Sequence, residues 1–190
     1  MLKRLTQCAH ICAIGLFVLV TSLHAQTKPV THVDVPDVPA RPEDVNTIDG
    51  IVKASYETIS GGVGVPRQWG RDRTLYDPNV RFVETNVDPK TGAIHALVTS
   101  HQEFVDLSDA SSVRDGFVEH ELGHKTYRFG NVATVLSSYE GKAMSTGKVV
   151  TRGVNIFQLY YDGKRWRILS IIWDDERPDN PIPADLLPKQ

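Results

Sequence analysis

Apolar residues recur at helical spacing where the patterned part of the chain begins. Between residues 45 and 59 they stand three and four positions apart, and Gly61–Gly62 follows as a stop. This spacing predicts a helix with one apolar face. A second, short helix is expected around residues 68–76, where Asp77-Pro78 ends it.

The next segment alternates between strand and helix signals. Residues 80–84 and 94–98 have strand composition and flank a turn, which predicts a hairpin. Ser100 and Glu103 then form the capping-box pattern of a helix N-terminus, so a short helix should run to about residue 107.

Two long hairpins are expected in the second half of the chain. Gly130-Asn131 and Asp162-Gly163 are dipeptides typical of tight turns between antiparallel strands. The strands that they join are expected at 113–129 with 132–139, and at 149–161 with 165–174.

The last hairpin predicts a second subunit. A two-residue loop at Asp162-Gly163 pairs Phe157 with Ile168 and Asn155 with Ser170. The opposite face would then carry five large apolar side chains: Val154, Ile156, Leu169, Ile171 and Trp173. The strands of a sheet with one solvated face alternate between apolar and polar residues. This hairpin is largely apolar on both faces, so both faces must be covered. With too few helices to cover both, a homodimer joined through this face is expected.

Residues 120–124 read His-Glu-Leu-Gly-His, which matches a zinc-protease motif. The motif requires a helix, where residues four apart can reach one metal, whereas on a strand they lie roughly 13 Å apart. The β-branched and aromatic flanks favour a strand, although periodicity alone leaves a helix open. We therefore expect no metal site, with a zinc metalloprotease as a minor alternative.

The expected strand register places both histidines on one face. Pairing Phe129 with Val132 sets His124 opposite Ser137, Leu122 opposite Tyr139 and Glu121 opposite Glu140. His120 and His124 would share a face with Tyr139, and Glu121 would point to the other face.

The N-terminus resembles a secretory signal. Lys3 and Arg4 precede an apolar stretch too short to span a bilayer, and a cut after Ala25 is expected, with an uncleaved anchor as the alternative. Cleavage would remove both cysteines and change the formal charge from −2 to −4, because the segment carries two basic residues and no acidic ones. The protein would be periplasmic or secreted, without disulfides and with no membrane contact after cleavage.

The terminal segments and the balance of charged residues complete the expected domain organisation. Residues 1–25 are the signal peptide, 26–42 a Pro-rich linker expected to be disordered, 43–177 one domain, and 178–190 a Pro-rich tail without a core pattern. Lys and Arg number 21 against 23 Asp and Glu, without a basic stripe, so no nucleic-acid partner is expected.

The order of elements and the segments 128–140, 153–159 and 165–174 resemble the nuclear transport factor 2-like, or SnoaL-like, superfamily. The resemblance covers roughly residues 43–185 and implies an α+β, cone-shaped fold: a curved mixed or antiparallel sheet wrapped around N-terminal helices and enclosing an apolar cavity. Members include isomerases, dehydratases, cyclases and binding or assembly modules without chemistry. No residue set aligns with the enzymes, so the catalytic residues remain unknown.

Eight residues are candidates for such a cavity: Tyr56, Trp69, His120, His124, Tyr139, Asn155, Ser170 and Asp174. A buried Tyr or Trp can equally be a core residue, and the strand residues can equally be surface groups. We expect a cavity containing Tyr56, Trp69 and at least one of His120, His124 and Asp174, since one suitably placed titratable group can move a proton.

Two main functions remain open. One is a cofactor-free isomerase, dehydratase or cyclase acting on a small apolar ligand, and the other is a non-catalytic binding or assembly module.

Overall fold

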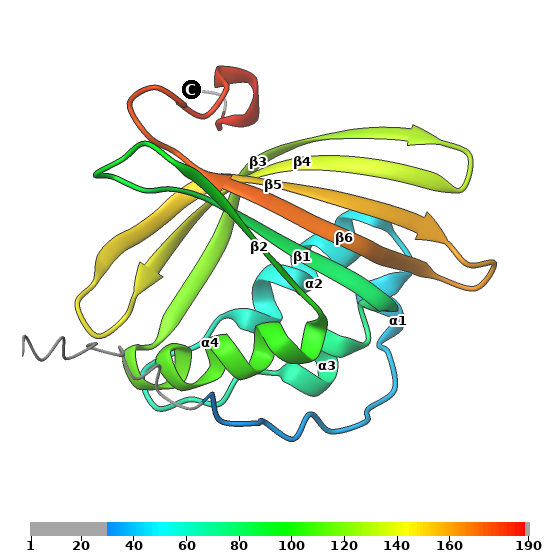
Figure 1. Ribbon diagram of the computed structural model, residues 1–190. Coiled ribbons are helices and arrows are strands. Elements are labelled where there is room, and N and C mark those ends of the chain that lie inside the picture. Colours follow the sequence, from blue (N-terminus) through cyan, green and yellow to red (C-terminus); the bar gives the residue numbers. More distant parts are fainter. Residues whose placement is uncertain (1–29, 189–190) are drawn as a thin grey trace, which may run out of the picture.

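The computed structural model describes residues 30–188 and has an α+β architecture (Figure 1). Residues 1–25, for which the sequence predicts a signal peptide, lie outside the described part. The helices are α1 (Pro42–Val45), α2 (Ile48–Ile59), α3 (Trp69–Arg73), α4 (His101–Asp115) and the 3₁₀ helix η1 (Ala184–Leu186). The strands are β1 (Tyr76–Val87), β2 (Ile94–Thr99), β3 (Phe117–Phe129), β4 (Val132–Ala143), β5 (Lys148–Tyr161) and β6 (Trp166–Asp175).

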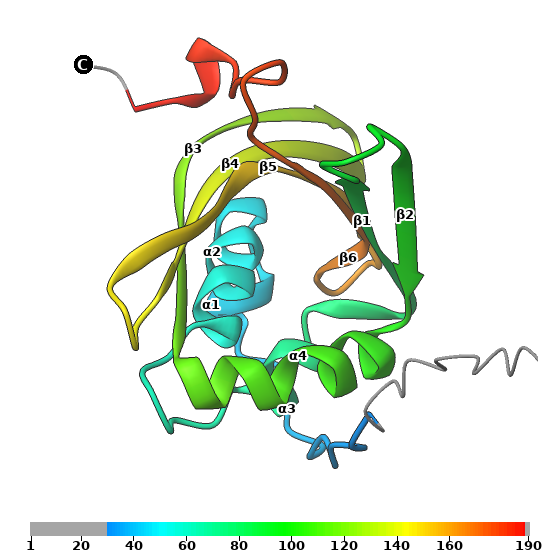
Figure 2. The ribbon, with the colours of Figure 1, turned by 60° about the vertical axis from the view of Figure 1, so that its left-hand side comes forward.

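The six strands form one curved sheet in the order β2-β1-β6-β5-β4-β3. The β1–β6 pair is parallel and the other pairs are antiparallel. Figure 2 shows the concave face wrapped around α2, with α4 across the opening below it. This mixed sheet around N-terminal helices confirms the cone-shaped α+β fold predicted from the sequence.

Helix α2 forms because its apolar stripe can enter the sheet. Thr47 caps its N-terminus by accepting a hydrogen bond from the Gly50 amide. Ile51 and Val52 are buried against core residues of the sheet such as Phe157. Burying one such aliphatic side chain contributes about 2 kcal/mol, so this stripe fixes the helix inside the cone.

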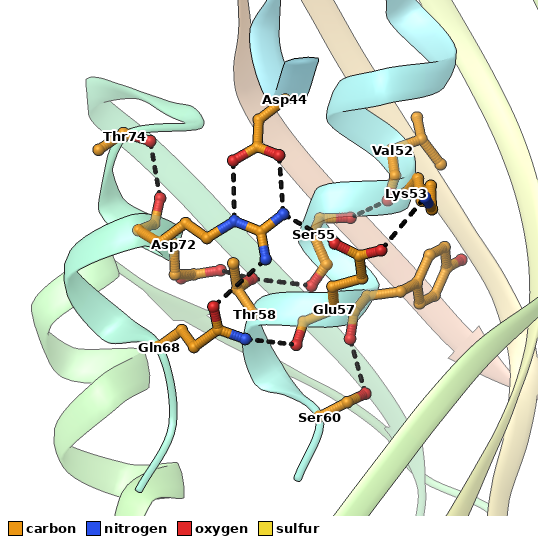
Figure 3. Close-up of polar contacts among 12 residues, drawn as sticks. Asp44, Val52, Lys53, Ser55, Glu57, Thr58, Ser60, Gln68, Asp72 and Thr74 are labelled. Carbon is orange, nitrogen blue, oxygen red and sulfur yellow. Dashed lines mark hydrogen bonds and ion pairs between the residues drawn. The ribbon is translucent and has the colours of Figure 1, made fainter. Parts of the chain in front are cut away.

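An arginine joins the first three helices (Figure 3). Arg71 donates to both carboxylate oxygens of Asp44, at 2.8 and 2.7 Å, and to Glu57 at 2.7 Å. Asp44 is buried, and a buried carboxylate requires such bidentate pairing. This ion pair fixes α3 beside α2 and so positions Trp69, the first residue of α3.

Strand β3 carries the His-Glu-Leu-Gly-His motif, so the strand prediction is confirmed. The pairs Phe129–Val132 and His124–Ser137 have the predicted register. Further along, the prediction is wrong: a β-bulge at Leu122 pairs Glu121 with Tyr139 and His120 with Glu140. The extra residue reverses the alternation. Glu121 therefore shares the concave face with His124, while His120 points outward.

The last hairpin also departs from the predicted register. Its loop has four residues instead of two, because Asp162 accepts the amide hydrogens of Lys164 and Arg165 and widens the turn. Tyr161 pairs with Trp166, and a second irregularity follows near Leu159.

This register moves several side chains. Asn155 pairs with Trp173, Ser170 with Gln158, and Phe157 with Ile171. Ile171 is thus a core residue of the concave face, which corrects its predicted place on the dimer face.

Three segment boundaries differ from expectation. Helix α4 continues to Asp115, so the following strand starts at Phe117 instead of residue 113. The N-terminal segment is extended but held in place, since Val33 donates its amide hydrogen to Asp106 of α4. The C-terminal tail buries Ile182 and Leu186, and Ser138 of β4 donates to the Leu186 carbonyl.

The tail lies on the sheet face opposite the helices (Figure 1). A shallow pocket between the tail and the sheet is lined by Ile156, Ile172 and Leu186. The chain's own C-terminus therefore covers part of the apolar outer face for which the sequence predicted a second subunit.

Candidate functional site

A cavity of about 520 Å³ lies between the concave face of the sheet and helices α2 and α4. Its walls are mainly aromatic and aliphatic, and it is open to solvent on one side. The aromatic lining residues are Tyr56, Trp69, Tyr76, Phe82, Phe104, Phe117, Tyr139, Phe157 and Trp173. The volume suits a small organic molecule.

One group of polar residues lies at the β3–β6 side of the cavity, and helix α4 contributes further hydroxyl groups opposite it. Tyr139 Oη donates to Asp175 Oδ1 at 2.7 Å, and Thr151 Oγ1 donates to the same oxygen at 2.9 Å. Asp175 lies at the exposed rim, and Asn155 is buried and donates to Tyr56 Oη at 3.2 Å. A ligand could therefore meet both apolar surface and hydrogen-bonding groups.

Glu119 is the titratable group inside this polar region. Ser60 of the α2 C-cap fixes its backbone, accepting the Glu119 amide hydrogen at 2.9 Å. Burial raises the pKa of the Glu119 carboxyl from 4.5 to about 8, and the charge of Asp175 adds to this, while a hydrogen bond from Asn155 opposes it. The carboxyl thus exchanges its proton near neutral pH.

The three tyrosines that line the cavity remain protonated. Burial raises the pKa of Tyr56 well above its ordinary value, against its hydrogen bonds with Ser137 and Asn155. Burial likewise raises the pKa of Tyr76 and of Tyr139, and the adjoining Asp175 carboxylate raises that of Tyr139 further. These phenols therefore do not act as bases.

Four of the eight candidate residues line the cavity, and four do not. Tyr56, Trp69, Tyr139 and Asn155 are lining residues. Those outside it are His120, His124, Ser170 and Asp174. None of the three titratable groups that we expected beside Tyr56 therefore reaches the cavity.

The strand register explains why these four candidate residues lie outside the cavity. Asp174 points outward and pairs with Arg177 at 2.9 Å, and Ser170 pairs with Gln158 instead of Asn155. Three acids do line the cavity, Glu84, Glu119 and Asp175, and the last two each lie one residue from a candidate. The sequence signal that could have identified Glu119 is its position two residues before Glu121 on one strand, but only with the bulge known.

His124 is instead the outer end of a hydrogen-bonded chain. Its Nδ1 lies 3.0 Å from Glu121 Oε2. Ser137 Oγ donates to Glu121 Oε1 at 2.5 Å, and the Ser137 and Tyr56 oxygens are 2.7 Å apart. This series of hydrogen bonds links the partly exposed imidazole of His124 to the phenol of Tyr56 in the cavity wall.

A second buried polar group adjoins the cavity but is internally satisfied. Asp72 accepts from Thr58 at 2.5 Å and from Tyr76 at 3.3 Å, and lies 2.9 Å from His101 Nε2. Each member already has a partner, so we assign this group a structural role, joining α2, α3 and α4.

Within residues 30–188, no group of three or more His, Cys, Asp or Glu side chains is arranged to hold a metal ion. His120 and His124 lie on a strand and face opposite sides of the sheet. Among the described helices, none has the length and apolar composition to cross a membrane.

Comparison with known proteins supports the fold. No protein-family model matches the sequence. No curated protein matches it either. The chain is similar in structure to Bd1075 of Bdellovibrio bacteriovorus, with a TM-score of 0.51 and 10% identity over 69% of this chain and 40% of that one. It thus spans well under half of that protein's length.

Two further solved structures are similar. One is a protein of unknown function with a cystatin-like fold from Nostoc punctiforme, with a TM-score of 0.50 and 7% identity over 73% of this chain and 98% of that one. The other is a nuclear transport factor 2-like protein of unknown function from Shewanella baltica, with a TM-score of 0.43 and 12% identity over 66% and 86%. The chain has a nuclear transport factor 2-like fold, and at these identities the similarity concerns the fold alone.

Proposed function

We propose that this chain is an exported small-molecule-binding protein and that Glu119 transfers a proton on the bound molecule. The observation that carries the proposal is one carboxyl with a pKa of about 8 in a largely aromatic cavity. A group that titrates near the working pH is suited to general acid–base catalysis. The reaction class would be isomerisation, dehydration or cyclisation without a cofactor.

The neighbouring groups suit this role. Tyr56 donates to Ser137 and Tyr139 to Asp175, so either phenol could donate to an oxygen of the ligand by exchanging that hydrogen bond, at the point where charge would develop as Glu119 removes a proton from an adjacent carbon.

The second candidate is a non-catalytic binding or assembly module. It is favoured by the position of His120, His124 and Asp174, all outside the cavity. A homodimer fits either candidate. Tyr127, Phe129, Val132 and Leu169 form an exposed apolar patch at the hairpin ends that the tail does not bury, with Phe129 87% exposed. Export rests on the N-terminal segment and would place the protein in the periplasm or outside the cell.

Native mass spectrometry of the purified protein, followed by extraction, would identify a co-purified molecule. Incubating that molecule in D₂O with wild type should introduce deuterium at an acidic C–H position. Glu119→Gln should bind the molecule and introduce none. Glu43→Gln, which removes an exposed carboxyl on α1, is the matched control.

Deuterium uptake with Glu119→Gln at the wild-type rate would rule out the catalytic role of Glu119. Binding without deuterium uptake in wild type would establish the binding module instead.

A further inference from the structure

The aromatic rings of the cavity form a continuous lining at its α4 side. Phe82 and Phe104 stack with their ring centres 4.7 Å apart. Trp69 and Trp173 each meet Phe104 edge-on, at 6.2 and 6.4 Å. The face of an aromatic ring is electron-rich and attracts a cation within about 6 Å of the ring centre, most strongly for Trp.

The charged groups of the cavity all have one sign. Glu84, Glu119 and Asp175 line it, and no Lys, Arg or His is among the described lining residues. In the part of the chain that the structure describes, ion pairs involve many carboxylates but none of these three. The cavity thus combines aromatic faces with carboxyl groups that form no ion pair within the described residues.

We infer that the ligand of this cavity carries a positively charged nitrogen, as a quaternary ammonium or protonated amine, attached to an apolar body. This inference rests on the proposed small-molecule-binding function and specifies the class of molecule. A neutral ligand would fill the apolar volume equally well but would leave the acids uncompensated. A carboxylate or phosphate ligand would meet these acids without any cationic side chain of the lining to balance its charge.

Binding of a cation should be coupled to a proton. Four titratable groups surround Glu119: Tyr56 on α2, Tyr76 on β1, Tyr139 on β4 and Asp175 on β6. The tyrosines are neutral and Asp175 opposes ionisation of Glu119, so a nearby cation is what would favour the carboxylate. A permanent cation should therefore displace the Glu119 proton into solvent and bind more tightly as the pH rises.

The test compares choline with its uncharged isostere, in which a quaternary carbon replaces the nitrogen. Each is titrated into the purified protein and followed by amide chemical shifts, at about pH 6 and about pH 9, on either side of the Glu119 pKa. At the higher pH, choline should bind at least about tenfold more tightly than the isostere, a ratio that corresponds to about 1.4 kcal/mol.

Two variants test whether Glu119 and Asp175 are responsible for the preference for choline. Choline affinity should rise by about tenfold between the two pH values in wild type and in Glu43→Gln, but stay constant in Glu119→Gln. Asp175→Asn should weaken choline and leave the isostere unchanged, and this unchanged binding reports that the variant is folded.

Choline binding no more tightly than the isostere at either pH, including no binding of choline, would overturn the inference. Binding of the isostere in that case would leave the proposed binding function standing. That function fails separately if the protein neither retains a co-purified molecule nor binds either probe.

Discussion

Replacing Glu119 by Gln should change the pH dependence of stability by a predictable amount. The unfolded chain loses the Glu119 proton near pH 4.5, whereas the folded chain keeps it until about pH 8. The folded pKa of this acid is raised, so the unfolded state binds fewer protons between these values and wild-type stability falls as the pH rises. The loss is about 1.4 kcal/mol per pH unit, or about 5 kcal/mol in total, of which about 4 kcal/mol falls between about pH 5 and about pH 8. Gln stays neutral and avoids this loss.

The measurement is urea denaturation of wild type and Glu119→Gln between about pH 5 and about pH 8, treated as two-state. The two proteins should have similar unfolding free energies at the acidic end, and the variant should be more stable at the alkaline end by about 4 kcal/mol. The pH-dependent contributions of all other groups are common to both proteins and cancel when the two unfolding free energies are subtracted. Glu43→Gln should show no such trend. A difference that does not change with pH would refute the burial of Glu119 and the acid–base role with it.

Three other predictions test the remaining structure. Ser137→Ala should cost about 1–3 kcal/mol of unfolding free energy in urea titrations, because it removes the acceptor of the buried Tyr56 hydroxyl and one donor to Glu121, whereas exposed Ser145→Ala should be neutral. Sedimentation equilibrium should give a dimer mass, and Leu169→Glu in the exposed patch should give a monomer; a monomeric wild type would contradict the predicted homodimer. Elemental analysis should find no stoichiometric zinc, and one chelatable zinc per chain would contradict the interpretation of the strand motif.

Local signals were enough to predict most elements of the fold, and the order of these elements, with the superfamily resemblance, predicted their cone-shaped arrangement. The apolar period before Gly61, the capping box at Ser100 and the turn dipeptides each depend on a few neighbouring residues, and each marks an element that the structure contains. The packing of Tyr56 follows from the same stripe. Such local rules require no knowledge of the partner strand, which is why they succeed from sequence alone.

The positions of the polar residues depend on register, and register depends on irregularities that leave no clear local mark. A one-residue shift turns every side chain beyond it to the other face. The bulge at Leu122 and the irregularity between Gln158 and Leu159 produce two such shifts, whereas the wider turn after Tyr161 moves the pairing by two residues and keeps the faces. They account for the exchange of His120 for Glu119 and of Asp174 for Asp175 as the side chains that enter the cavity.

Because of the bulge, the His-Glu-Leu-Gly-His segment of β3 has a different role from the metal binding that its sequence suggests. On a regular strand, Glu121 and His124 would point to opposite faces. The extra residue at Leu122 brings them to the same face, 3.0 Å apart, where Glu121 accepts from Ser137. Glu121 thus supports the wall of the cavity through Tyr56, while Glu119, two residues earlier, faces its interior. One irregularity therefore places both acids on the concave side, where Glu121 is held between Ser137 and His124 and Glu119 lines the cavity, and that difference in position is why we assign the chemistry to Glu119.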